Sequence, residues 1–165
     1  MSPRYPIDDH LGLRTLLVAA AYVVLLRPSD GRTEVLLQLR AGTGYMDGHW
    51  AVLAGHVDPG ESVHDAAVRE AAEEAGVTVL IEDLEPLTAL HRFVPAGAAV
   101  DQRIDMFFAA RRWDGEPAVR EVEKAAAMGW FPLDELPDPV VPYERLILDA
   151  LARDRALPAV ISYRL

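Results

Sequence analysis

The sequence predicts an α/β fold in which a mixed β-sheet lies between helices, arranged as an α/β/α sandwich. Segments with strand patterns precede and follow two single helical segments, at 62–76 and 142–153, which favours helices on both sides of one sheet. The chain has 165 residues, of which 51% are hydrophobic, enough for a sizeable core. We therefore expect a single domain over residues 1–165, with residues 1–12 as a loose N-terminal arm.

The expected elements follow one another along the chain. A hairpin comes first, because the segment 28–32 (PSDGR) places an Asp-Gly turn between two strand-like segments. Strands are expected at 14–27, 33–40, 50–54, 87–94, 103–111 and 127–133, with short ones at 78–80 and 159–163. One helical turn is expected at 133–137. The helix at 142–153 is amphipathic, with Leu146, Ile147, Ala150 and Leu151 on one face.

The apolar run at 16–26 (LLVAAAYVVLL) has two interpretations. With eleven residues it is too short to span a bilayer, but it could imitate the apolar part of an export signal. Asp8 and Asp9 precede the run, and Arg27 and Pro28 follow it in place of a small-residue cleavage site. Its β-branched and aromatic residues favour a buried central strand.

Composition excludes several classes of function. The formal net charge of -10 argues against nucleic acid or an anionic membrane as the main partner. A small phosphate-bearing substrate stays compatible with it, because a bound metal ion inverts the local charge. The chain has no cysteine, which excludes disulfides, thiolate nucleophiles and cysteine-based zinc sites.

The helix at 62–76 has clear start and stop signals. Ser62 is a suitable N-cap, with Asp65 three residues on, and Gly76 is a typical residue just beyond a helix end. The expected back face consists of small apolar residues, namely Val68, Ala71, Ala72 and Ala75. Such a face would let the helix lie close on a sheet and hold its other side chains rigidly.

Three glutamates on this helix indicate a cation site. Glu70, Glu73 and Glu74 stand at positions i, i+3 and i+4, which share one helix face. Like charges at i and i+4 destabilise a helix unless something neutralises them. Mg2+ is the natural neutraliser, because it is a hard cation that prefers carboxylate oxygen.

The spacing around these glutamates resembles the signature of the Nudix hydrolase family. The signature is Gly-x5-Glu-x7-Arg-Glu-U-x-Glu-Glu-x-Gly-U, where U is aliphatic, and the segment 55–77 matches every fixed position. The matching residues are Gly55, Glu61, Arg69, Glu70, Ala71, Glu73, Glu74, Gly76 and Val77. Ala71 is smaller than the aliphatic residue usual there. We call the segment 55–77 the box, and its helix the box helix.

The resemblance implies a Nudix-type α/β/α sandwich and a role for each box residue. Glu70, Glu73 and Glu74 would bind Mg2+, with Mn2+ as a substitute. Glu70 would also orient or deprotonate the attacking water, although family members differ in which residue is the base. Glu61 and Arg69 would support these ligands, because an arginine can fix a carboxylate by pairing with it. Gly55 leaves room for the backbone to approach metal or phosphate.

Residues outside the box are predicted by weaker signals. A further carboxylate from the loop after Gly115 often approaches the metal in this family, and here Glu121 is the better match and Glu123 the alternative. Arg40, at the end of a strand, matches a family position that contacts substrate phosphate, and a surface role is the alternative. His56 is a second candidate phosphate contact. For His91, Arg92 and Asp105, structural and substrate-facing roles are both left open.

The predicted function is metal-dependent hydrolysis of a diphosphate linkage in a small-molecule nucleotide. A (d)NTP cleaved to the monophosphate and pyrophosphate is the first choice of substrate. Segment 140–144 has no asparagine, which argues against the subgroup that removes oxidised guanine nucleotides. The alternatives are ADP-ribose or another nucleoside diphosphate derivative, and a Nudix-fold sensor that binds without hydrolysis. We expect a cytoplasmic protein with no membrane or nucleic-acid partner, and a homodimer is left open.

Overall fold

The computed structural model describes residues 15–165, so the predicted arm at 1–12 and the start of the first strand at residue 14 lie outside the described residues. The strands are β1 (Val18–Ser29), β2 (Arg32–Arg40), β3 (Trp50–Ala51), β4 (Leu53–His56), β5 (Glu85–Phe93), β6 (Gln102–Ala110), β7 (Ala125–Pro132) and β8 (Val160–Arg164). The helices are α1 (Val63–Glu70), its π-helical continuation η2 (Ala71–Ala75), the 3-10 turns η3 (Ile81–Asp83) and η4 (Ala99–Asp101), and α2 (Pro142–Ala152).

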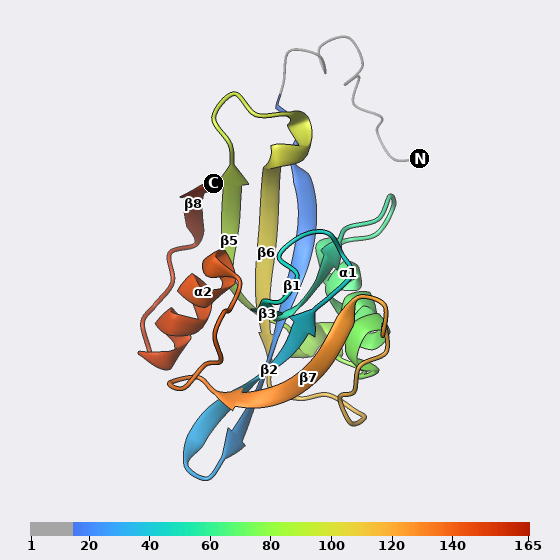
Figure 1. Cartoon of the computed structure of the whole chain (residues 1–165), viewed down its shortest axis with the longest axis vertical. Helices are drawn as coiled ribbons and strands as arrows, with labels where there is room; N and C mark the ends of the chain where they lie inside the picture. The colour runs from blue at the N-terminus through green and yellow to red at the C-terminus, as the bar shows by residue number, and fades with distance from the viewer. Residues whose placement is uncertain (1–14) are drawn as a thin grey trace.

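Strand β1 is the centre of a mixed sheet (Figure 1). On one side its first half pairs antiparallel with β4 and its last residues pair antiparallel with β2. On the other side it pairs parallel with β6 from Val18 to Leu25. Strands β5 and β8 extend the sheet beyond β6, and β3 and β7 both pair with β2. The long strand therefore reaches both the box, through β4, and the β5–β6 hairpin.

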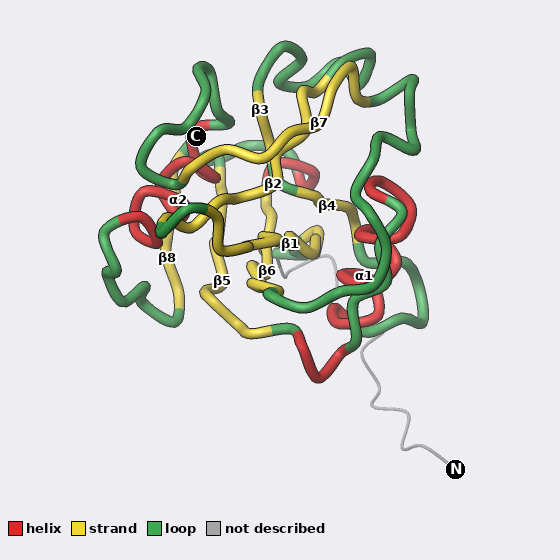
Figure 2. Tube along the Cα trace, turned by 90° about the horizontal axis from the view of Figure 1, so that it is seen from below, coloured by secondary structure: helices red, strands yellow, loops and turns green. Residues whose placement is uncertain are grey.

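The two main helices cover opposite sides of the strands, as the view from below shows (Figure 2). Alternate residues of β1 enter two different cores, since successive side chains of a strand point to opposite faces. Tyr22 and Val24 belong to the core under α2, whereas Val23 and Leu25 belong to the core under α1. Burial on both faces explains why the run at 16–26 is continuously apolar. The predicted central strand and the sandwich of helices around a mixed sheet are confirmed.

The first hairpin also forms as predicted. Strands β1 and β2 are joined at Asp30 and Gly31, whose φ angles are 48° and 79°. Two consecutive left-handed residues are the geometry that a two-residue hairpin requires, and Asp-Gly accommodates it well. The pairing with β1 covers only the first residues of β2, and Arg40 at the far end of β2 pairs with Ala125 of β7.

Several local predictions were wrong. The expected short strand at 78–80 is reduced to an isolated bridge between Thr78 and Asp114. The expected strand at 50–54 is two short strands, β3 and β4, which pair with β2 and β1 respectively. Segment 133–137 is not helical but a turn, closed by the hydrogen bond from Glu135 N to Pro132 O.

On α2 the predicted Ile147 is buried, but Leu146 is 43% exposed, and the helix also buries Tyr143, Glu144 and Leu148. The inner face of α2 includes the buried carboxylate of Glu144, so it does not coincide with the stripe of apolar residues. No helix within residues 15–165 is long and apolar enough to cross a membrane.

Candidate active site

The box helix begins and ends where its sequence signals predict. The Ser62 hydroxyl accepts a hydrogen bond from Asp65 N at 3.1 Å, and the Asp65 carboxylate accepts one from Ser62 N at 3.0 Å. This reciprocal capping box satisfies two backbone donors that a helix start otherwise leaves free. Gly76 ends η2 in the left-handed region, with φ of 73°. The helix is thereby fixed at both ends relative to strand β4.

The buried face of the helix carries two of the three glutamates. Glu70 and Glu74 are buried beside a row of small residues, namely Ala66, Ala67, Ala71 and Ala75. The predicted back face was wrong at Ala72, which is exposed, because the inner stripe centres on the glutamates. Glu73 lies on the flank, with half of its side chain exposed. The two inner carboxylates thus face the pocket, while Glu73 approaches it from outside.

Gly55 is directly opposite the Glu70 carboxylate. A Cβ added at Gly55 would lie 1.8 Å from Glu70 Oε1 and 2.0 Å from the carboxylate carbon. Gly55 sits on β4 beside Ala21 of β1, so the backbone there cannot move away easily. Only glycine therefore lets the Glu70 carboxylate lie against strand β4.

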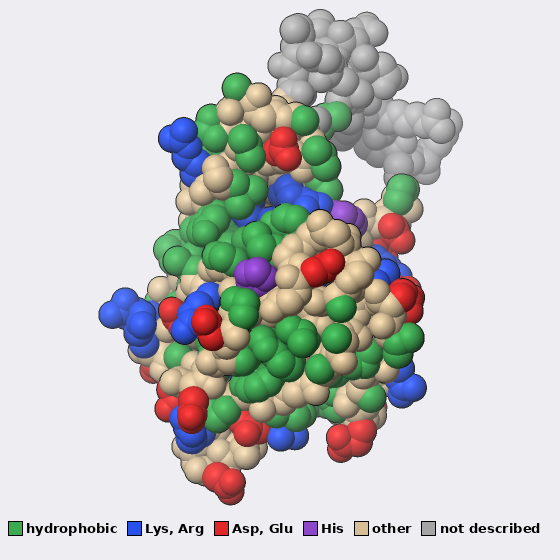
Figure 3. Space-filling model, viewed as in Figure 1, with side chains coloured by type: hydrophobic (Ala, Val, Ile, Leu, Met, Phe, Trp, Pro, Cys, Tyr) green, Lys and Arg blue, Asp and Glu red, His purple; other side chains and the backbone are tan. Residues whose placement is uncertain are grey.

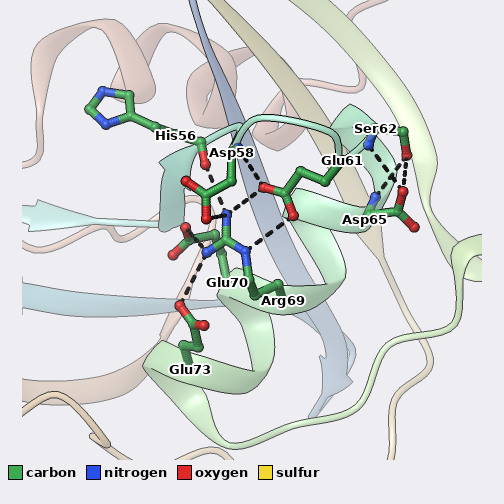
Figure 4. A network of polar contacts seen from close by, with 8 residues as sticks. All are labelled: His56, Asp58, Glu61, Ser62, Asp65, Arg69, Glu70 and Glu73. Atoms are coloured by element: carbon green, nitrogen blue, oxygen red, sulfur yellow. Dashed lines mark hydrogen bonds and ion pairs between the residues drawn. The ribbon is translucent and has the colours of Figure 1, made fainter.

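Arg69 is the centre of a network of carboxylates (Figure 4). Its guanidinium donates to both oxygens of Glu61, at 2.7 and 3.2 Å. The same group donates to Glu70 at 2.5 Å, to Glu73 at 3.1 Å and to the carbonyl oxygen of His56 at 2.9 Å. Paired contacts of this kind fix both partners, because the guanidinium is planar and its donors diverge at set angles. Arg69 therefore holds Glu70 and ties the helix to the end of β4.

Glu74 is the most strongly perturbed carboxylate of the box. Its side chain accepts a hydrogen bond from Ala54 N at 2.8 Å and another from Gln38. Burial raises its pKa to about 7, with a further contribution from the charges of Glu70 and Glu121. Burial also raises the pKa of Glu70. Carboxylates that are buried together and short of positive charge favour either a proton or a bound cation.

The loop before β7 brings Glu121 to this cluster. Arg120 N donates to Glu74 O at 3.1 Å and Ala118 N donates to Ala75 O at 3.0 Å, which fastens the loop along η2. Glu121 lines the pocket and forms an ion pair of 2.7 Å with Lys124. Glu123 is exposed and does not line the pocket. Of the two predicted alternatives, Glu121 is the one that the fold places beside the box glutamates.

Arg40 and His56 both line the pocket, but they point to different parts of it. Arg40 donates to Tyr45 O at 3.0 Å and to the Thr43 hydroxyl at 3.1 Å, which fixes the loop after β2. The His56 imidazole points away from the carboxylate network (Figure 4) and contacts Arg103. His56 is therefore close to the box in sequence but faces a different group.

Sequence reasoning missed several residues of the pocket, among them Tyr22, Glu144 and Arg103. These residues line it together with Arg92 and Tyr143. The Glu144 carboxylate accepts a hydrogen bond from Val52 N at 2.7 Å, and burial raises the pKa of Glu144 to about 8. Its place on the second helix gave no signal, because it looks like an ordinary polar position of an amphipathic helix.

The sequence is compatible with a structural and with a substrate-facing role of Arg92, and the position of Arg92 in the structure fits both roles. It is 1% exposed and paired with Asp105, which is fully buried. Its guanidinium also lies 3.9 Å from the centre of the Tyr143 ring and donates to the hydroxyls of Tyr22 and Tyr45. The expected hairpin of segments 87–94 and 103–111 could have suggested the pair, because Arg92 and Asp105 lie diagonally across its register.

These residues surround a cavity of about 480 Å³, within the range of small-molecule sites. One part, which we call the acidic end, consists of Glu70, Glu73, Glu74 and Glu121. The other part, which we call the basic end, consists of His56, Arg92 and Arg103. Figure 3 shows basic and histidine side chains meeting in a recess below the connection of β5 and β6. One cavity is thus lined by both groups, and Arg69 and Lys124 pair with carboxylates of the acidic end.

The acidic end has the donor chemistry of a hard divalent cation. All four side chains offer carboxylate oxygens, which suit Mg2+ or Mn2+. Within residues 15–165, no three Asp, Glu, His or Cys side chains converge into a ready metal-binding group. Arg69 accounts for part of this, because its guanidinium lies between Glu70 and Glu73. The residues fit such an ion by their type and burial, provided that the Arg69 and Glu73 side chains move so that the carboxylates can converge.

Comparison with known proteins gives a consistent result. The chain is 31% identical over 111 residues to the asymmetrical bis(5'-nucleosyl)-tetraphosphatase of Rattus norvegicus, covering 67% of this chain and 73% of that protein. It is 46% identical over 63 residues to the Caenorhabditis elegans protein of the same name, covering 38% of this chain and only 44% of that protein. The crystal structure of a MutT NUDIX hydrolase from Burkholderia pseudomallei superposes with a TM-score of 0.69 at 28% identity, covering 81% of this chain and 97% of that one.

The relatives are hydrolases by name, in agreement with the predicted class of enzyme. The solved structure confirms the predicted α/β/α sandwich. The NUDIX domain family matches residues 16–151, which include the complete box and the loop of Glu121. Because this match covers most of the chain, the chain belongs to the Nudix family.

Proposed function

We propose that this protein is a metal-dependent pyrophosphohydrolase that cleaves the diphosphate linkage of a nucleotide. The observation that carries the proposal is the pair of buried carboxylates, Glu70 and Glu74, which face one cavity and have raised pKa values because of burial. Buried carboxylates alone repel a polyphosphate, so this arrangement supports binding through a cation. Family membership supports the same class of reaction.

Glu70, Glu73, Glu74 and Glu121 would hold Mg2+, or Mn2+ in its place. When bound, the ion supplies positive charge to the polyphosphate and polarises an attacking water. Glu70 orients that water and accepts its proton, and its raised pKa suits a base working near neutral pH. Arg69 and Glu61 hold the Glu70 carboxylate in place through the contacts described above.

Arg40 and His56 serve substrate binding in this proposal. Arg40 sits at the cavity wall with its guanidinium already oriented by Thr43 and the Tyr45 carbonyl, so little side-chain entropy is lost on phosphate binding. His56 lines the same cavity from the end of β4. Gly55 keeps strand β4 close to the reacting groups.

A (d)NTP, cleaved to the monophosphate and pyrophosphate, is our first choice of substrate. A bis(5'-nucleosyl) tetraphosphate is the second candidate, because two of the relatives are named for hydrolysis of that class. We place the protein in the cytoplasm and treat the whole chain as one domain; both stay predictions, as does a homodimer.

A panel of nucleotides with Mg2+ tests the proposal. We expect release of a monophosphate from at least one of three substrates: a (d)NTP, a dinucleoside tetraphosphate and ADP-ribose. Phosphorus NMR monitors this release. The products identify the class, since a (d)NTP gives pyrophosphate and a dinucleoside tetraphosphate gives a nucleoside triphosphate. Chelation with EDTA should abolish the activity. Tight binding of a nucleotide without turnover, in Mg2+ and in Mn2+, would instead identify a sensor.

A further inference from the structure

The basic end of the cavity is built by side chains on three strands, β4, β5 and β6. Arg92 on β5 lies directly opposite Arg103 on β6 in the antiparallel register. Like charges directly opposite one another destabilise a sheet. One buried carboxylate, Asp105, accompanies the two arginines, and it is paired with Arg92. Among the described residues Arg103 has no ion pair with a carboxylate, so one positive charge at this end lacks a carboxylate partner there.

Arg103 carries that uncompensated charge. Among the described residues, its side chain makes one polar contact, with His56 Nε2. Its Nε is buried and has no hydrogen-bond partner within the same residues. An unpaired buried donor on a charged group is unfavourable, and native proteins usually satisfy it with a partner or a ligand. Asp105 Oδ1, two residues along β6, is likewise buried and unpaired among the described residues, so this carboxylate oxygen does not satisfy the Arg103 donor. Arg103 Nε is therefore a buried donor without an acceptor, on a side chain that lines a cavity.

His56 adds a second nitrogen group to the same place. Burial lowers its pKa, and the neighbouring charge of Arg103 lowers the pKa further. A neutral imidazole can accept from Arg103 through Nε2, as the contact requires. The positive charge of Arg103 disfavours protonation of His56, and an anion bound beside both groups would offset that charge. The pair is thus arranged to be stabilised by negative charge.

The sheet places a small residue beside this pair. His56 on β4 and Asp105 on β6 both pair with Ala20 of β1, one on each side. Ala20 also lines the cavity, and its side chain is only a methyl group. Arg103 pairs with Val18, two residues before Ala20, and its contact with His56 joins the two basic groups at the cavity wall. This pair lies apart from the carboxylate network, since the His56 ring points away from it (Figure 4).

We propose that Arg103 and His56 form an anion-binding subsite for a phosphate group of the substrate that lies remote from the carboxylates of the box helix. The proposal rests on the proposed function and adds a requirement to it. A substrate must extend a phosphate from the acidic end to the basic end, so the site selects a polyphosphate chain over a single phosphate. Arg103 supplies the charge, and His56 positions it and adds one hydrogen bond.

Direct binding of inorganic tripolyphosphate to the full chain, in Mg2+ and followed by calorimetry, tests the subsite without any turnover. Loss of a hydrogen bond to a charged group predicts a roughly tenfold or greater rise in Kd for Arg103→Gln. Arg103→Lys should recover part of the lost affinity, because lysine restores the positive charge but not the planar set of guanidinium donors. The matched control is Arg111→Gln, which removes an exposed arginine directly after the other end of that strand. Equal Kd values for Arg103→Gln and the unmodified protein would overturn the proposal, and so would equal weakening in the control.

A structural readout covers the case in which a variant folds poorly. In the unmodified protein, the Nε–H resonance of Arg103 should shift on addition of tripolyphosphate, and a resonance that does not move would contradict the subsite. Arg103→Gln removes one of two opposed arginines, so its thermal midpoint should not fall.

Kinetics separate this inference from the proposed function. Arg103→Gln should raise KM for a nucleoside triphosphate roughly tenfold with little change in kcat, because the contact is made equally in ground and transition states. A fall in kcat at constant KM would contradict a subsite. If no nucleotide is hydrolysed, the proposed function fails, yet the tripolyphosphate titration still decides whether Arg103 and His56 bind an anion.

Discussion

The two ends of the cavity reach opposite charge by different structural routes. The acidic end comes mainly from one helix, on which Glu70 and Glu74 are one turn apart and share the buried face. The basic end comes from separate strands, because Arg92 and Arg103 are brought opposite each other by the β5–β6 register. One end is therefore made by local spacing and the other by sheet assembly.

The difference also concerns what balances each charge. At the acidic end Arg69 contacts Glu61, Glu70 and Glu73, so one cation is shared among three carboxylates. At the basic end one carboxylate accompanies two arginines. Lys124 adds a second cation to the acidic end through its pair with Glu121. Among the described residues each end still carries an excess of one sign of charge, and a metal-bound polyphosphate would supply charge of the opposite sign to each. Substitutions at the acidic end should affect the chemical step, and those at the basic end should affect binding or stability.

Glu70→Gln should show the largest effect at the acidic end. Glutamine keeps the size of the side chain but cannot accept a proton or bind a cation as strongly. We expect kcat to fall about 1000-fold, in the range of a lost general base, with a nearly unchanged free energy of unfolding. Product release in a continuous assay, together with urea denaturation, measures both quantities.

Glu82→Gln is the matched control for that experiment, because Glu82 is an exposed glutamate outside the cavity. It should retain normal activity. A rate for Glu70→Gln within a few-fold of the unmodified protein would remove Glu70 from the proposed reaction, and with it the functional contrast between the two ends.

Asp105→Asn should show the largest effect at the basic end, and it should be an effect on stability. The substitution leaves the buried Arg92 guanidinium without a countercharge, which costs about 3 kcal/mol in comparable buried pairs. Urea denaturation at neutral pH measures the loss.

An exposed ion pair provides the reference for Asp105→Asn. Asp134 pairs with Arg32 at the surface, so Asp134→Asn should cost less than about 1 kcal/mol. Similar losses for the two variants would mean that Arg92 finds another partner, such as the hydroxyls of Tyr22 and Tyr45.

Glu144 lines the cavity, and charged residues of both ends affect its pKa. Its pKa is raised from 4.5 to about 8, first by burial, and the charges of Arg40 and Arg92 oppose the shift while Glu74 adds to it. Because the folded pKa exceeds the unfolded one, its contribution to stability is complete below about pH 4.5 and is lost as the pH rises through 8. Glu144→Gln should remove that loss, so it should be more stable than the unmodified protein at pH 9, by about 5 kcal/mol.

The comparison for Glu144→Gln is made at pH 5, where both proteins should have similar stability because Glu144 is then protonated in the folded state. Urea denaturation at pH 5, 7 and 9 gives the difference directly. A constant difference across this range would show that Glu144 does not titrate there, and that the basic end holds it ionised throughout.

How far the sequence could predict each end follows from the same contrast. Helical spacing and the capping residues Ser62 and Asp65 are local, so the box helix and its glutamates were predictable. The pairing of Arg92 with Asp105 depends on the register of two strands, and short apolar segments leave that register undetermined. Glu144 was hidden for a related reason: its partner, Val52 N, belongs to a distant element.

Gly55→Ala should show the smallest of these effects and sharpens the contrast most. The new Cβ would meet the Glu70 carboxylate, which is the end of a flexible side chain, so the fold can adjust by moving that group. We expect an unchanged thermal midpoint and a kcat lower by about tenfold, as for a misplaced catalytic group. The double variant Gly55→Ala with Glu70→Gln should be no slower than Glu70→Gln alone, because both changes act through one carboxylate. Additive losses would instead show that Gly55 acts through the backbone of β4, and that the acidic end depends on the sheet as much as the basic end does.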